Sequence, residues 1–174
     1  MSLVYEDLNH SLRAGMQAEI SDDIRTGVLY MSPRLTLAGR SRWPQLLLDA
    51  AAKYDDNWLA AEVRVLLNQK ETSTSSKGKI FEKEVPVNAH ETLAEGEFNR
   101  YYIRAACLTA IGLSSKLEVY RGKQVEHPRN ESTAMLGRLM DPHSLLIDLR
   151  KSNGIESSLG LPPGPNSGLT VRLK

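Results

Sequence analysis

Charged and amide side chains gather in residues 88–113, a run whose apolar residues otherwise follow helical spacing. The polar members are Glu91, Glu95, Glu97, Asn99, Arg100 and Arg104. Arginines one helical turn apart can point the same way, and the planar guanidinium binds phosphate or carboxylate with two hydrogen bonds. Asn99 and Arg100 interrupt the apolar run, so we expect some of these polar groups to be buried and paired.

Two further arginines follow this segment in the sequence. Arg121 ends a predicted strand over residues 116–125, and Arg129 lies in the loop that leaves it. We therefore predict that at least three of the arginines border one concave site for a phosphate or a partner's carboxylate, with Glu97 and Asn99 beside it. The four are Arg100, Arg104, Arg121 and Arg129. The competing prediction is an internal network in which Glu91, Glu95, Glu97 and Glu118 pair with them.

The pair Arg121-Gly122 at a strand end resembles the arginine strand of ADP-ribosyltransferases, in which that arginine positions a dinucleotide. The family pattern continues with a Ser-Thr-Ser strand and then Glu-x-Glu. Here Ser132-Thr133 precedes a predicted helix, and Glu156 stands alone. A metal-dependent nuclease would need carboxylates and a lysine around one phosphate, and Glu118 and Lys123 do not alternate in that way.

Other catalytic or cofactor patterns are absent from the sequence. The four histidines are scattered, and the single Cys107 permits neither an internal disulfide nor a paired-cysteine zinc site. The glycines of the C-terminal tail are not followed by a helix, as a phosphate-binding loop would require. We expect no metal and no cofactor, and we assign no catalytic residue.

The positions of apolar residues predict an α+β fold, with several helices around one long central helix over about 88–113 and a small antiparallel sheet. Helices are predicted over residues 3–20, 44–54, 58–67, 133–139 and 142–153, and strands over 79–87, 116–125 and 169–173, with a further extended segment at 26–31. Asp141 and Pro142 are typical of an N-cap and first helical position.

The chain is predicted to form a single domain over residues 1–174. Residues 69–79 are rich in Ser, Thr and Lys, which favours a mobile loop. Residues 159–168 contain three prolines and three glycines, which favours an extended tail.

The composition indicates a globular protein. Charged residues make up 25% of the 174 residues, hydrophobic residues 41%, and the formal net charge is +1. A near-neutral chain has no overall attraction for nucleic acid. No run is long and apolar enough to span a bilayer, and the first ten residues lack the pattern of a signal peptide, so we expect a cytoplasmic protein that does not enter the membrane.

These observations favour a small non-enzymatic binding or assembly subunit that binds a protein partner or itself. The amphipathic N-terminal helix and the extended tail are the predicted docking segments. The run of residues 93–104 resembles small proteins carried by phages and other mobile elements, which would imply such an origin. The alternative is a nucleic-acid-binding protein or nuclease that uses the basic half of the chain from Arg121 onward.

Overall fold

The computed structural model describes residues 3–153 and 167–174, and it confirms the α+β class and the long central helix. The elements are α1 (His10–Thr26), α2 (Leu37–Lys53), α3 (Asp56–Arg64), β1 (Lys70–Thr74), β2 (Ile80–Glu84), α4 (Ala89–Gly112), β3 (Leu117–Arg121), α5 (Asn130–Ala134), β4 (Leu139–Met140), α6 (Pro142–Lys151) and β5 (Leu169–Leu173). Most of the predicted tail, residues 159–166, lies outside the described residues.

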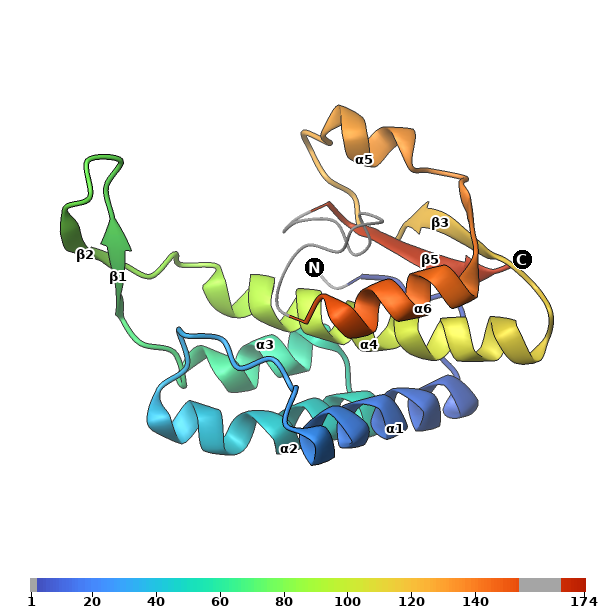
Figure 1. Cartoon of the computed structure of the whole chain (residues 1–174), viewed down its shortest axis with the longest axis horizontal. Helices are drawn as coiled ribbons and strands as arrows, with labels where there is room; N and C mark the ends of the chain where they lie inside the picture. The colour runs from blue at the N-terminus through green and yellow to red at the C-terminus, as the bar shows by residue number, and fades with distance from the viewer. Residues whose placement is uncertain (1–2, 154–166) are drawn as a thin grey trace.

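Helix α4 runs through the middle of the molecule, with α1, α2 and α3 on one side and α6 and strands β3 and β5 on the other (Figure 1). It is buried around much of its circumference, because the consecutive residues Tyr101, Tyr102, Ile103 and Arg104 point in different directions around the helix and are all 1% exposed or less. A helix covered on several sides cannot have a single apolar stripe. This explains why the apolar residues in its sequence are distributed over more than one face of the helix.

Helix α1 differs from its prediction at both ends. Asn9, not a residue near Leu3, caps it, and its side chain accepts a hydrogen bond from the backbone N–H of Leu12. The helix then continues through residues 21–23, beyond its predicted end at residue 20, and ends at Gly27, whose φ of 74° suits glycine. Its face of Leu12, Met16 and Ile20 is buried in the core.

The two-helix prediction for residues 44–67 is confirmed as α2 and α3, although α2 begins earlier. Thr36 is its N-cap, and Pro44 lies inside the helix instead of at its first position. Asp55 separates the helices by capping α3, accepting a hydrogen bond from the Trp58 N–H at 2.8 Å. The segment 26–31, expected to be extended, forms no strand.

The strands form two antiparallel sheets instead of the expected one. Strands β4, β3 and β5 form a three-stranded sheet, while β1 and β2 form a separate hairpin. Strand β1 lies within residues 69–79, which the sequence suggested as a loop. Polar Ser and Thr residues form this strand because it pairs with β2 along its full length and lies outside the apolar core.

In the C-terminal half, helix α6 begins where the sequence predicted, and helix α5 begins earlier. The Asp141 N-cap and Pro142 start of α6 are confirmed. Helix α5 begins at Asn130, before the predicted residue 133, so Ser132 lies inside it and donates a hydrogen bond to the Arg129 carbonyl.

Among residues 3–153 and 167–174, no helix has the length and apolar content needed to cross a membrane.

Candidate functional site

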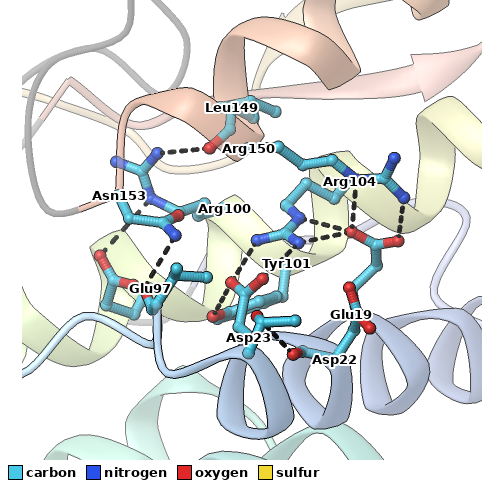
Figure 2. A network of polar contacts seen from close by, with 12 residues as sticks. Glu19, Asp22, Asp23, Glu97, Arg100, Tyr101, Arg104, Leu149, Arg150 and Asn153 are labelled. Atoms are coloured by element: carbon cyan, nitrogen blue, oxygen red, sulfur yellow. Dashed lines mark hydrogen bonds and ion pairs between the residues drawn. The ribbon is translucent and has the colours of Figure 1, made fainter.

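The most polar part of the interior is a network of ion pairs between α1, α4 and α6 (Figure 2). Arg104 on α4 is its centre and is 1% exposed. Its guanidinium binds both carboxylate oxygens of Asp23, at 2.6 and 2.9 Å, and donates to Glu19 at 2.7 Å. Tyr101 donates to Asp23 at 2.8 Å, and the Arg104 guanidinium also lies 4.9 Å from the Tyr101 ring centre. All the donors and acceptors of this arrangement come from the protein itself.

Arg150 of α6 extends this network to the surface. It binds both carboxylate oxygens of Glu19, and its own side chain is 48% exposed. Burial alone would raise the pKa of Glu19, but hydrogen bonds and positive charge from Arg150 and Arg104 outweigh burial and hold that pKa below its usual value. Glu19 therefore stays ionised between two arginines and links three helices.

Glu97 and Arg100 lie one turn earlier on α4. Arg100 donates to the Leu149 carbonyl and to the Ser152 hydroxyl at the end of α6, and its Nε lies 3.5 Å from Glu97. The other Glu97 oxygen is buried and has no hydrogen-bond partner among the described residues. Burial raises the pKa of Glu97, against the opposing charge of Arg100.

The remaining predicted site residues lie in other surroundings. Asn99 donates to the Leu169 carbonyl and accepts from Thr170, which joins α4 to β5. Arg121 donates to the Ser167 carbonyl at 2.6 Å. Arg129 is exposed and forms the N-terminal boundary of α5. The structure thus encloses Arg100 and Arg104 inside the fold, whereas Arg121 contacts the segment before β5 and Arg129 lies exposed at the start of α5.

Arg104 pairs with Glu19 and Asp23, which are not among the glutamates that the sequence suggested as partners for the four arginines. Glu95 pairs with Lys123, and Glu118 pairs with Arg172 and Lys174. Asp23 was missed because the predicted helix ends at residue 20, and Glu19, within that helix, was then left without the second acid on its face. Continued to residue 26, that helix places the two acids four residues apart on one face, which is the available sequence signal.

The described parts of the chain can be compared with two further kinds of site, a metal centre and a reactive cysteine. They contain no group of three His, Cys, Asp or Glu side chains able to hold a metal ion. Cys107 is buried on α4, and burial raises the pKa of its thiol to about 12, so it is not a thiolate at neutral pH.

A shallow pocket lies between the N-terminal segment and the end of α2, lined by Tyr5, Leu8, Arg13, Lys53 and Tyr54 among others. Its arginine is already engaged, because Arg13 donates to the carbonyls of Ala50 and Ala51. The pocket therefore shows no set of convergent groups directed at a ligand.

The β1–β2 hairpin is the most exposed regular element, and it stands away from the helices (Figure 1). Every residue of β2 is exposed and no residue of β1 is buried. Ile80 is 69% exposed and Phe81 42%. Arg34 holds the base of the hairpin through an ion pair with Glu71 at 2.6 Å, and Lys83 lies 3.3 Å from the same carboxylate.

The hairpin turn is a sharp reversal fixed by local backbone contacts. Ser75 donates to the Lys79 carbonyl, and Gly78 donates to the Ser75 carbonyl. Gly78 has a φ of 78°, a conformation that glycine adopts without strain. Ile80 and Phe81 follow this turn directly, so two large apolar side chains are presented near the tip of a projecting arm.

Comparisons of this chain with protein-family models, with curated proteins and with solved structures found no match.

Proposed function

We propose that this protein is a small assembly subunit that binds another protein chain through the β1–β2 hairpin. The observation that carries the proposal is the exposure of both strands, with Ile80 and Phe81 uncovered. An isolated two-stranded hairpin is only marginally stable in water, and a third strand or a packed face is the usual source of its stability. A partner chain would supply that contact.

The hairpin takes the place of the N-terminal helix, one of the two docking segments that the sequence suggested; most of the other, the tail at residues 159–168, lies outside the described residues. The apolar face of α1 is covered by the fold, since Leu12 and Met16 are 1% and 0% exposed. That helix is therefore a core element. The sequence did not predict the hairpin, because its first strand is polar and has a composition typical of a loop.

The alternative function, nucleic-acid binding by the basic C-terminal half, has weaker support. Several of its cations are paired with carboxylates, namely Lys123 with Glu95, Arg150 with Glu19, Arg172 with Glu6 and Glu118, and Lys174 with Glu118. A cation engaged by a protein carboxylate contributes less to neutralising phosphate. We retain nucleic acid as one outcome of the test below.

Photo-crosslinking tests this proposal. Phe81 is replaced by the photo-reactive residue p-benzoylphenylalanine in the full chain, which is expressed in cells and irradiated. We expect a covalent adduct with a protein chain, identified by mass spectrometry, because Phe81 would lie within the interface.

The matched control places the same residue at Ile147, an apolar position on α6 that is 54% exposed. An equal adduct yield at the two positions would contradict docking through the hairpin. An adduct with nucleic acid at position 81 would make nucleic acid, and not a protein chain, the partner of the hairpin and would contradict the proposal.

A further inference from the structure

The backbone of the hairpin presents hydrogen-bonding groups along two open edges. The hydrogen bonds Val85 N–H to Gln69 carbonyl and Ser75 N–H to Lys79 carbonyl fix which residues face inward. In an antiparallel pair the inward-facing residues alternate with residues whose N–H and C=O point away. With the observed register, the outward groups belong to Lys70, Thr72 and Thr74 on β1 and to Ile80, Glu82 and Glu84 on β2.

We infer that a second copy of this chain binds head to tail, with the β2 edge of one copy pairing antiparallel with the β1 edge of the next. This inference depends on the proposed function and names its partner. An open strand edge is a template for pairing with another strand, and the described part of the chain places no strand on either edge.

Charge complementarity selects this arrangement and its register. Within one hairpin, Lys70 lies opposite Glu84 and Glu71 opposite Lys83. If the same register is repeated between copies, β2 of the first copy meets β1 of the second with both opposite-charge pairs again in place. Every outward residue of β2 then also faces an outward residue of β1, so the backbone groups match.

Shifting the register by two residues in either direction loses part of this match. Glu71 of the second copy would then lie opposite Phe81 or Val85 instead of Lys83. The matched register also places the apolar side chains next to small ones, with Ile80 beside Thr74 and Phe81 beside Ser73 of the second copy.

Symmetric pairing of identical edges is less favourable. If two β2 edges paired symmetrically about Glu82, the two Glu82 carboxylates would lie opposite each other. If they paired about Phe81, Lys79 of each copy would lie opposite Lys83 of the other. Two β1 edges centred on Thr72 would form no opposite-charge pair. Head-to-tail pairing leaves one edge open at each end, so it produces rings or filaments instead of closed two-fold dimers.

Two proline variants of the full chain test this inference. Thr72→Pro removes an outward N–H from β1, and Glu82→Pro removes one from β2. Proline is tolerated at such outward positions of an edge strand, because no hydrogen bond within the hairpin is lost. The mass in solution is measured by sedimentation velocity over a range of concentrations.

We expect the wild-type chain to form species larger than a dimer as the concentration rises, and each variant alone to remain at the monomer mass of 19.4 kDa. An equimolar mixture should form a dimer and nothing larger, because one variant keeps its β2 edge and the other its β1 edge. A wild-type chain that stays monomeric, variants that assemble like the wild type, or a mixture that stays monomeric would each overturn the inference. If Phe81 crosslinks to a different protein while the wild-type chain stays monomeric, the proposed function stands and self-pairing fails.

Discussion

Replacing Arg104 by Met should lower the free energy of unfolding by about 3 to 5 kcal/mol, since the substitution leaves two buried carboxylates without their shared cation. Glu19 and Asp23 are 6% and 4% exposed, and Arg104 contacts both. Met fills a similar volume, so the loss would reflect charge more than packing. Urea denaturation measures the difference.

The control for Arg104→Met is Arg25→Met. Arg25 also pairs with an acid of α1, Asp22, but its side chain is 74% exposed. We expect this control to change the free energy of unfolding by no more than about 0.5 kcal/mol. If the two variants had equal stability, the buried network would not stabilise the fold. The prediction that Arg104 binds an anion would then regain support.

A second pair of substitutions should separate the two buried glutamates. Glu19→Gln is expected to cost about 2 to 3 kcal/mol at neutral pH, because it removes charge-assisted hydrogen bonds to Arg104 and Arg150. Glu97→Gln should cost much less, because burial already favours the neutral form of Glu97. Both are measured by urea denaturation between pH 3 and pH 8, about the range in which glutamates titrate.

The pH dependence of the two effects has opposite signs. The pKa of Glu19 is lowered by folding, so its contribution to stability is present above the usual glutamate pKa and is lost as the pH falls through the lowered value. The pKa of Glu97 is raised, so its contribution is present at low pH and is lost as the pH rises through the raised value. Curves for the two variants that run parallel to each other across this pH range would contradict the assignment.

The sequence predicted those elements whose pattern is local. Helix α4 was predicted because its apolar and helix-forming residues extend over many turns, and α6 because Asp141 and Pro142 mark its start. Strand β5 was predicted from simple alternation. The burial of Asn99 and Arg100 was also predicted from the sequence, since polar residues within an apolar helix are buried together with their hydrogen-bond partners.

Features that depend on contacts distant in sequence could not be predicted in the same way. Arg104 meets Glu19 and Asp23 across more than eighty residues, and no spacing in the sequence identifies that pairing. Strand β1 is polar because both of its faces remain outside the core, so it lacks the apolar alternation that identifies a buried strand. Its existence depends on pairing with β2.

Amide hydrogen exchange, measured residue by residue, shows whether a second copy covers the edges of the hairpin. The N–H groups of Thr72 and Glu82 point away from their own hairpin and pair with no strand of residues 3–153 and 167–174, so pairing with a neighbouring chain would protect them. We predict slow exchange at these two positions in concentrated solution and faster exchange on dilution, with a smaller change at the inward-facing Ser73, which is also bonded within its own hairpin. Fast exchange at Thr72 and Glu82 at every concentration, with Ser73 still protected, would show that no second copy covers the hairpin edges.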